Sequence, residues 1–448
     1  MAVKISVLGA GSSVFSMNFI KDLCLTESLA GSEISFMDIS EERLDNSYGL
    51  CCRLAAEMGV DFRITKTTSR EESLKGASFV VDTILIGGYD NWTEGWEIAE
   101  KWGYRRGGSL HIMHDEAFWS NFYQLRMMES VAEDIRKYCP DAWLLMVANP
   151  VMAGTTYLRR KYPDVKMVGL CHGTSMIRFV AKYLEMDMKD VEWEIPGINH
   201  YVFMNHFYYK GENAFPILDR WITEKSEEFF KTCKDSALFG PKVIDLYQRY
   251  GVLPIGDTAS PGGGSWGYEY HSDREVEKRW KEDPKQWFAD YIVRNKKRVE
   301  TIRETVNDMS RSVLELTGTE MSPEPMAPLI ESLSVGKEHK LVVNVLNDRN
   351  YVPGYPLDFA VEVPALCGKF GIQPIATDPL PKAIIMRGIH DRVVPVELEL
   401  LAYENRSRAG LLDLVMTDPR SHSLAQAEGL VNEILNLPYH KEMKEWYR

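Results

Sequence analysis

Apolar segments that favour β-strands alternate with helical segments through the first part of this 448-residue chain. Strands are expected at residues 4–8, 33–38, 62–67, 79–85, 143–148 and 166–170, and helices at residues 13–26, 41–58 and 120–138. Strands joined through helices at this spacing form a parallel sheet with right-handed crossovers. The sequence therefore predicts an α/β protein that begins with a Rossmann-like sheet.

A glycine-rich turn, Gly9-Ala10-Gly11-Ser12, lies between the first expected strand and the first expected helix. The backbone amides of such a turn, with the helix N-terminus, bind a pyrophosphate. Asp38 ends the second strand, where a carboxylate accepts hydrogen bonds from an adenosine ribose and repels a 2′-phosphate. This arrangement favours NAD⁺ over NADP⁺. Val14 stands where the motif has its third glycine, so a simple tight turn is the alternative interpretation.

The second half of the sequence has a mixed pattern. Residues 191–194, 200–208, 340–346 and 360–366 are typical of strands, whereas residues 221–316 and the tail from residue 380 are mainly helical. We predict a Rossmann-like NAD-binding domain of residues 1–196 and a mixed α/β domain of residues 197–448 for catalysis and oligomerisation. The active site is expected between the two domains.

Cys171-His172-Gly173 and Asn199-His200 each follow a strand-like segment. A thiolate from Cys171 and an imidazole from His200 form a soft donor pair that suits a divalent transition metal such as Zn²⁺, Mn²⁺ or Fe²⁺. The two residues are too far apart for one helix face, so their convergence depends on the fold. Taken singly, a buried Cys is more often a packing residue and a His a hydrogen-bonded one.

Three further segments place polar side chains near strand ends. Asn149, before Pro150, follows a strand at the edge where such sheets bind ligands. The loop at residues 107–116 contributes His111, His114, Asp115 and Glu116. Asp257 follows Gly256 in an otherwise apolar segment. Either aspartate could instead be a turn residue, which is common for Asp beside Gly.

Composition excludes several other classes of protein. Apolar residues make up 45% and charged residues 26%, as in ordinary globular proteins. The net charge of −13 argues against a nucleic-acid partner and against an anionic membrane surface. No apolar run approaches ~18 residues, and a strand begins at residue 4 without room for a signal peptide. Seven cysteines suit a reducing compartment, so we expect a soluble cytoplasmic enzyme.

In this order, the motifs resemble those of the NAD- and metal-dependent glycosidases of glycoside hydrolase family 4, along nearly the whole chain. The matching segments are Gly9-Ala10-Gly11-Ser12, Met37-Asp38-Ile39, Glu41-Glu42-Arg43-Leu44, Ala148-Asn149-Pro150, Cys171-His172-Gly173, Gly197-Ile198-Asn199-His200, Pro254-Ile255-Gly256-Asp257-Thr258, Val361-Glu362-Val363-Pro364 and Asp418-Pro419-Arg420. NAD-dependent family 4 is an exception to two-carboxylate glycoside hydrolysis. The resemblance implies a fold similar to that of lactate and malate dehydrogenases.

The resemblance also implies roles for individual residues. The implied NAD⁺ site consists of Gly9, Ala10, Gly11, Ser12, Asp38 and Arg43. The implied metal ligands, normally for Mn²⁺, are Cys171 and His200, with sugar hydroxyls completing the shell. Asn149 and His172 match substrate-side positions, Asp257 a candidate base and Asp115 an active-site acid. The implied assembly is a homodimer or homotetramer with a small carbohydrate as substrate.

The family's reaction is an oxidation–elimination–addition–reduction sequence. NAD⁺ oxidises C3 of the sugar, a base removes the acidified C2 proton while the metal stabilises the enediolate, and the C1 substituent leaves before water adds and the hydride returns. The Cys-His-Gly form resembles the branch that acts on unphosphorylated α-glycosides such as α-glucosides and α-hexuronides. Two loops depart from the family pattern, at Ala259-Ser260 and at Gly107-Gly108-Ser109, which leaves the sugar open.

Two other classes of function share part of this pattern. An NAD-dependent 2-hydroxyacid dehydrogenase of the lactate/malate type has the same fold and the Asn-Pro element, but it has no use for a Cys–His metal pair. A dinucleotide-sensing protein without catalysis would bind NAD⁺ and need no metal. Cys171 and His200 therefore favour the glycosidase.

Overall fold

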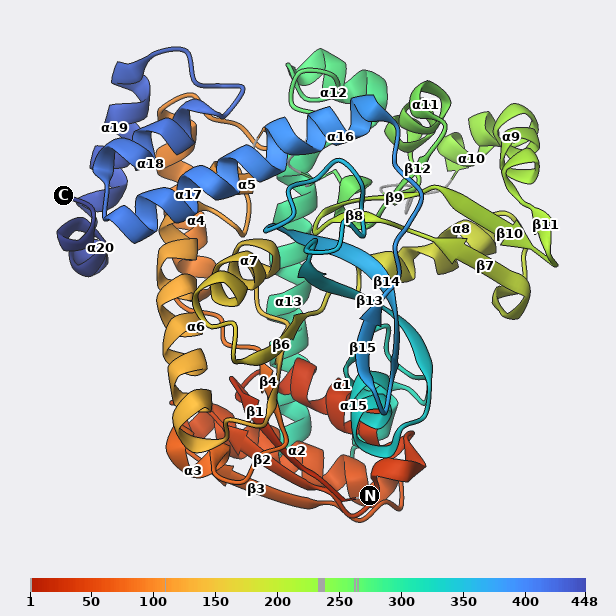
Figure 1. Cartoon of the computed structure of the whole chain (residues 1–448), viewed down its shortest axis with the longest axis vertical. Coiled ribbons are helices and arrows are strands. Elements are labelled where there is room, and N and C mark those ends of the chain that lie inside the picture. Colours follow the sequence, from red (N-terminus) through yellow and green to blue (C-terminus); the bar gives the residue numbers. More distant parts are fainter. Residues whose placement is uncertain (1, 109, 233–237, 262, 264–265) are drawn as a thin grey trace.

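The computed structural model describes residues 2–108, 110–232, 238–261, 263 and 266–448 (Figure 1). The first half contains the strands β1 (Lys4–Leu8), β2 (Glu33–Met37), β3 (Arg63–Thr67), β4 (Phe79–Asp82), β5 (Trp143–Met146) and β6 (Lys166–Gly169). Its helices are α1 (Ser13–Cys24), α2 (Glu41–Glu57), α3 (Arg70–Leu74), α4 (Gly88–Lys101), α5 (Leu110–Met113), α6 (Phe118–Tyr138) and α7 (Val151–Lys161). All six strands expected in this half are present, and they pair in parallel.

The second half continues with both strands and helices. Its strands are β7 (Val191–Glu194), β8 (Gly197–Ile198), β9 (Tyr201–Met204), β10 (His206–Tyr209), β11 (Glu212–Asn213), β12 (Leu253–Ile255), β13 (His339–Leu346), β14 (Ala360–Gly368) and β15 (Gly371–Pro374). Its helices are α8 (Ile177–Tyr183), α9 (Phe215–Glu224), α10 (Ser226–Thr232), α11 (Pro241–Tyr250), α12 (Arg274–Trp280), α13 (Pro284–Asn307), α14 (Val313–Thr317), α15 (Met326–Val335), α16 (Lys382–Gly388), α17 (Val394–Asn405), α18 (Arg408–Met416), α19 (Leu424–Leu435) and α20 (Lys441–Trp446). The helical tail expected from residue 380 is confirmed.

One large sheet joins the two halves. Its strand order in the described residues is β12-β9-β8-β14-β13-β6-β5-β4-β1-β2-β3, with β15 paired to β14. The hairpin of β13 and β14 attaches antiparallel to β6, where Asn344 is opposite Gly169, and Gly197 of β8 is opposite Glu362 of β14. The sheet therefore runs through the predicted domain boundary at residues 196/197, and the division into two domains stays a prediction.

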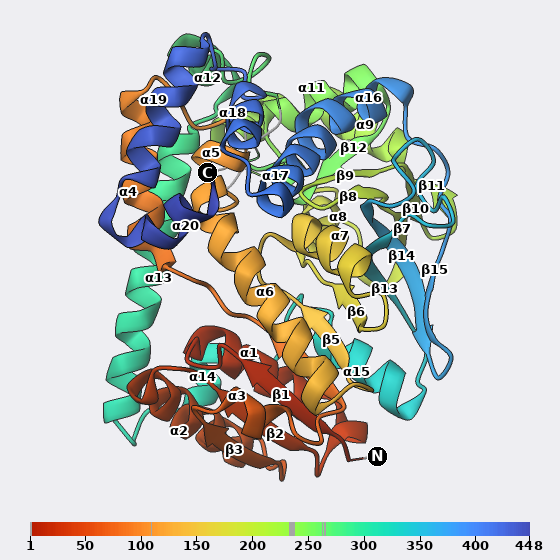
Figure 2. The same cartoon turned by 60° about the vertical axis from the view of Figure 1, so that its left-hand side comes forward.

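The parallel strands inside the sheet are largely buried on both faces, as expected for an α/β sheet, whereas the edge strand β3 is partly exposed. Successive residues alternate between two cores: Val80 faces the core formed with α6 and α7, and Val81 faces the core formed with α1, α2 and α15. A third core lies under α8, α9 and α11. Figure 2 shows α13 running along one side of the molecule, from the region of α12 to α1 and α2, which it contacts.

One expectation about secondary structure was wrong. Residues 200–208 do not form one strand, because the chain leaves the large sheet at Asn205 and continues as β10 in a separate sheet of β11, β10 and β7. Helices α3, α4, α7 and α8 were not among the expected helices, and residues 151–158 of α7 are all buried. None of the helices in the described part of the chain has both the length and the apolarity needed to cross a bilayer.

Candidate active site

The glycine-rich turn packs against the end of β2. The amides of Gly9 and Ala10 donate to the carbonyl of Met37 at 2.9 and 3.0 Å, and the amide of Gly11 donates to Oδ2 of Asp38 at 2.9 Å. A Cβ atom at Gly11 would lie 2.6 Å from that same Oδ2. A side chain at position 11 would therefore displace the Asp38 carboxylate, so the turn and Asp38 pack directly against each other.

The N-terminus of α1 opens directly from this turn. Ser12 makes no side-chain capping bond, and the first turn of α1 carries no acidic residue. Amides at such a terminus attract an anion. Arg43 is exposed, and its Cβ would lie 3.0 Å from a Cβ added at Gly11. Ile39, beside Asp38, is 87% exposed, an apolar side chain at the sheet edge to which the sequence analysis gave no role. These residues fit a dinucleotide.

The fold brings Cys171 and His200 together. Cys171 follows β6, and His200 precedes β9 with a φ of 60°, an unusual value for a residue with a side chain. The Cys171 thiol hydrogen bonds with the His200 imidazole and accepts from the amide of Gly173 at 3.4 Å. Burial and then the charge of Glu362 raise the pKa of the thiol. Cys171 and His200 are therefore neighbours in the structure, which their separation in the sequence could not establish.

Two carboxylates contact opposite nitrogens of the His200 ring. Nδ1 lies 2.7 Å from Oε1 of Glu116, and Nε2 lies 3.2 Å from Oδ2 of Asp257. Burial opposes the charged imidazole, but Asp257, Cys171 and Glu116 together raise the pKa of His200 well above its usual range. Because Nδ1 is held by a carboxylate, Nε2 is the nitrogen that a metal would use.

Glu116 is fully buried and paired with a buried arginine. Nη2 of Arg392 lies 3.3 Å from Oε2 of Glu116 and donates to the carbonyl of Asn199 at 3.3 Å. Burial acts against the Glu116 carboxylate, but Arg392 and then His200 hold its pKa far below the usual range. Glu116 therefore stays ionised and fixes the orientation of His200. In the sequence Glu116 was one of four titratable residues of the loop at residues 107–116, and no role was predicted for it.

Asp257 holds the other side of the ring from a short 3₁₀ helix, η5 (Gly256–Thr258). This helix lies against η2 (Gly173–Met176), since a Cβ at Gly256 would approach the backbone of Gly173 to 3.3 Å. The hydroxyl of Thr258 accepts from the amide of Val202 at 2.8 Å and ties η5 to β9. The Asp257 side chain is 34% exposed, so it can reach both His200 and a bound substrate.

Asp115 and Asn149 also meet. Nδ2 of Asn149 donates to Oδ2 of Asp115 at 3.0 Å, and the other oxygen of Asp115 pairs with Nδ1 of His114. Although burial opposes ionisation, the charge of His114 holds the pKa of Asp115 below its usual value. Asp115 is therefore an acceptor at neutral pH and not a proton donor.

A second buried carboxylate supports the site from β14. Oε2 of Glu362 accepts from Nδ2 of Asn199 at 3.0 Å and from Nδ2 of Asn344 at 3.2 Å. Burial raises the pKa of Glu362, while the two amides act in the opposite sense. In the sequence Glu362 is an acid within the apolar segment Val361-Glu362-Val363, which matches the family pattern, but no role was predicted for it.

His172 and Tyr268 lie outside this group of contacts. His172 is 62% exposed, with Nδ1 3.1 Å from Oε1 of Glu324. Tyr268 is 63% exposed and donates its hydroxyl to the carbonyl of Pro419 at 3.1 Å. The substrate-binding role of His172 stays a prediction.

The described residues contain no group of three or more His, Cys, Asp or Glu side chains arranged around a metal position. The donors that the structure brings together are the thiol of Cys171 and the imidazole of His200, and the carboxylate of Asp257 lies next to the imidazole. Such a pair fits a metal whose remaining ligands come from water or substrate, as in sites with open positions.

Comparison with known proteins defines the class. The family model described as family 4 glycosyl hydrolase matches residues 4–186, and that of the family's C-terminal domain matches residues 195–421. The chain therefore belongs to family 4 of the glycosyl hydrolases, as the sequence motifs predicted. This membership favours a glycosidase over the dehydrogenase and sensor alternatives.

Relatives extend over almost the full chain. An α-galactosidase of Bacillus subtilis (strain 168) is 26% identical over 440 residues, which cover 96% of each chain. An α-galacturonidase of Thermoanaerobacter italicus is 24% identical and covers 97% of this chain and 96% of its own. The sugars that these relatives act on differ, so the family alone does not define the substrate of this chain.

Solved structures confirm the fold. A 6-phospho-α-glucosidase from gut microorganisms, in complex with NAD and Mn²⁺, has a TM-score of 0.81, 21% identity and 99% coverage of both chains. Malate dehydrogenase from Picrophilus torridus has a TM-score of 0.52 at 16% identity, with 90% of this chain and 98% of that one covered. The expected lactate/malate-dehydrogenase-like architecture is confirmed.

Proposed function

We propose that this chain hydrolyses unphosphorylated α-glycosides, either α-glucosides or α-hexuronides, with NAD⁺ and Mn²⁺ as cofactors. The observation that carries the proposal is the position of Asp257 beside the Cys171–His200 pair, 3.2 Å from Nε2 of His200. A proton-transfer group next to a soft donor pair suits elimination chemistry, whereas direct displacement needs two carboxylates across the glycosidic bond. The α-galactosidase and α-galacturonidase relatives support an unphosphorylated substrate.

Two parts of the chain would hold the cofactors. Gly9 to Ser12 and the N-terminus of α1 would bind the pyrophosphate, with Asp38 and Arg43 toward the adenosine. Cys171 and His200 would hold the metal. When bound, the nicotinamide supplies reversible hydride transfer and the metal supplies Lewis-acid stabilisation of negative charge on the sugar oxygens.

Of the remaining carboxylates in the site, one is proposed to transfer a proton and the others to hold the substrate or the neighbouring side chains in position. Asp257 is the proposed base, because its carboxylate is partly open and is not paired with an arginine or lysine in the described residues. Asp115, with its lowered pKa, would accept a hydrogen bond from a sugar hydroxyl together with Asn149. Glu116 and Glu362 would hold His200 and Asn199 in place.

The test is hydrolysis of p-nitrophenyl α-glucoside, α-galactoside and α-galacturonide, with and without NAD⁺, Mn²⁺ and a thiol reductant. We expect release of p-nitrophenol only when all three additions are present. Equal release without NAD⁺ would contradict the redox route. Net NADH formation from a 2-hydroxy acid would favour the dehydrogenase, and NAD⁺ binding without turnover of any glycoside would favour the sensor.

The predicted cytoplasmic location and homo-oligomeric state stay predictions, as does the choice between glucoside and hexuronide. His172 is the candidate for a substrate carboxylate, because its hydrogen bond with Glu324 raises its pKa. A higher kcat/KM for the galacturonide than for the glucoside, abolished in His172→Gln, would favour the hexuronide.

A further inference from the structure

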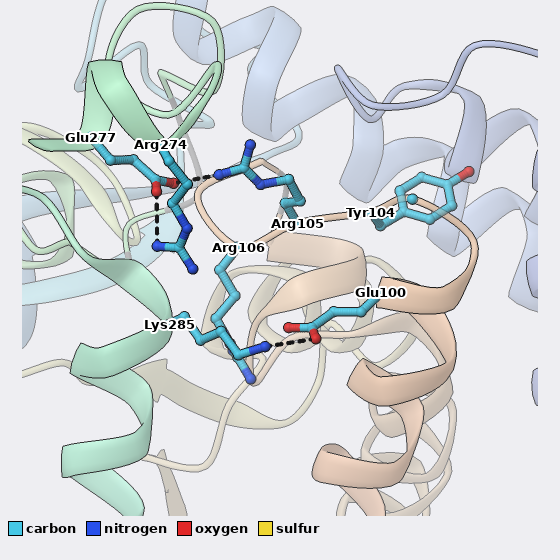
Figure 3. A pocket seen from close by; sticks show the side chains of 8 residues that line it. Glu100, Tyr104, Arg105, Arg106, Arg274, Glu277 and Lys285 are labelled. Carbon is cyan, nitrogen blue, oxygen red and sulfur yellow. Dashed lines mark hydrogen bonds and ion pairs between the residues drawn. The ribbon is translucent and has the colours of Figure 1, made fainter.

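A pocket of about 330 Å³ lies where the segment that follows α4 meets α12 and the start of α13 (Figure 3). Six of its lining residues are charged: Glu100, Arg105, Arg106, Arg274, Glu277 and Lys285. None of its lining residues belongs to the group around His200. A pocket of this volume is at the lower end of the range for small-molecule sites.

The charges that line the pocket do not balance. Arg105 and Arg274 share Glu277, with Nη2 and Nη1 at 3.2 and 3.0 Å from its two oxygens. Lys285 pairs with Glu100 at 2.8 Å. The lining therefore holds two carboxylates and four cations. Asp283, just outside the lining, lies 3.4 Å from Nη1 of Arg274 and offsets a third cation, so one positive charge remains unbalanced.

Arg106 is the cation without a carboxylate. Its guanidinium stacks on the rings of Trp96 and Phe288, 3.8 and 4.3 Å from their centroids, and donates to the carbonyl of Met113 at 3.2 Å. Within the described residues, no carboxylate lies within ion-pair distance of it. Burial lowers its pKa to about 10. Aromatic faces hold the guanidinium plane and leave N–H groups for a further acceptor.

The positive field extends behind the pocket. His271 is buried next to Arg105, and its pKa lies well below the usual value because of burial and then the charges of Lys242, Arg420 and Arg105. The shared Glu277 is itself almost fully buried, so it is not available to a further cation. Lys242 is itself paired with Glu282 at 2.8 Å, so the positive charge left to meet an anion in the pocket is that of Arg106.

We propose that this pocket binds a phosphate monoester of about the size of a monosaccharide phosphate. A phosphate monoester carries ≈ −1.5 to −2 charge at neutral pH and offers three strong acceptor oxygens, which can meet Arg106 and the neighbouring cations together. Guanidinium groups bind phosphate oxygens through paired, charge-assisted hydrogen bonds, and three arginines converge here. A monocarboxylate offers only two acceptor oxygens to the same set of donors.

The test is calorimetric titration of the full-length chain with glucose 6-phosphate, inorganic phosphate and glucuronate. We expect glucose 6-phosphate to bind and glucuronate to bind at least tenfold more weakly. Equal affinity for inorganic phosphate would support the site and show that it recognises the phosphate group and not the sugar. Binding of glucuronate as tight as that of glucose 6-phosphate, or no binding of either phosphate, would overturn the proposal.

Variants locate the binding. Lys285→Gln and the double variant Arg105→Gln/Arg274→Gln should each weaken the binding of glucose 6-phosphate at least tenfold. Lys278→Gln is the control and should not weaken it, because Lys278 lies on the helix of Arg274, α12, but is exposed and pairs with Glu275. Lys285→Gln leaves the buried Glu277 pairs intact, so it remains informative if the double variant fails to fold. Unchanged affinity in a folded Lys285→Gln variant would contradict the proposal.

Hydrogen exchange separates this pocket from the active site without relying on turnover. Glucose 6-phosphate should slow exchange in peptides that contain residues 103–106 and 274–285. Slower exchange confined to residues 171–173 and 256–258 would place the phosphate at the active site and overturn the proposal.

Discussion

The two carboxylates on either side of His200 have opposite environments. Glu116 is fully buried, paired with Arg392 and held ionised, whereas Asp257 is 34% exposed and no lysine or arginine of the described residues pairs with it. Both carboxylates contact the same imidazole, Glu116 at 2.7 Å from Nδ1 and Asp257 at 3.2 Å from Nε2. The difference shows that a carboxylate next to a candidate metal ligand can either orient that ligand or transfer a proton. The burial of the carboxylate and its pairing with a cation distinguish the two roles.

The largest expected effect comes from removing the shared imidazole or its thiol partner. His200→Ala and Cys171→Ser should each abolish Mn²⁺-dependent hydrolysis, because each removes one of the two side chains proposed to hold the metal. NAD⁺ binding, measured by fluorescence titration, should remain. His206→Ala is the matched control, because that histidine pairs with Asp378 at the surface. Near-normal turnover of either variant in Mn²⁺ would contradict the metal assignment.

Asp257→Asn tests the chemical side of the comparison. Loss of a general base should lower kcat by ~10²–10⁴-fold, while C3 oxidation, seen as transient NADH absorbance, stays at least partly intact. In D₂O the wild-type product should carry deuterium at C2 of the sugar, which direct displacement does not predict. Wild-type turnover in Asp257→Asn would place the base elsewhere, with Asp115 next in line, since Tyr268 lies outside the group around His200.

Glu116→Gln tests the positioning side. An outer-shell partner of a metal-bound histidine typically contributes 10–100-fold in metal affinity, so the Mn²⁺ concentration for half-maximal activity should rise by roughly that factor. Saturating Mn²⁺ should restore most of kcat, whereas it should not rescue Asp257→Asn. If Glu116→Gln lowered kcat at saturating Mn²⁺ as strongly as Asp257→Asn, the distinction between the two carboxylates would be wrong.

The same contrast explains how much of the molecule could be predicted. The strands of the first half and the glycine turn depend on residues close in sequence, and they were predicted well, with β1 matching residues 4–8. The pairing of Glu116 with Arg392 spans 276 residues, and that of Asn199 with Glu362 spans 163. The Glu116–Arg392 contact depends on the segment before α17 packing against the segment before α6, and the Asn199–Glu362 contact depends on β14 lying beside β8 in the strand order of the sheet. No local pattern encodes that order.

Local prediction also has a limit at the cofactor turn, where Asp38 has two tasks. Its Oδ2 accepts from Gly11 and its Oδ1 accepts from the amide of Ser40 at 3.0 Å, so Asp38→Ala would loosen the turn for either cofactor. Asp38→Asn keeps the size and one acceptor while it removes the charge, which makes it the sharper substitution.

Asp38→Asn should therefore weaken NAD⁺ binding by about tenfold, the value of one charge-assisted hydrogen bond. NADP⁺ binding should change less or improve, because a carboxylate repels the 2′-phosphate. Fluorescence titration with both cofactors gives the two dissociation constants, and Glu41→Gln, an exposed acid in the first turn of α2, is the matched control. Equal weakening for both cofactors would show that Asp38 only holds Gly11 and Ser40, and that the preference for NAD⁺ arises elsewhere.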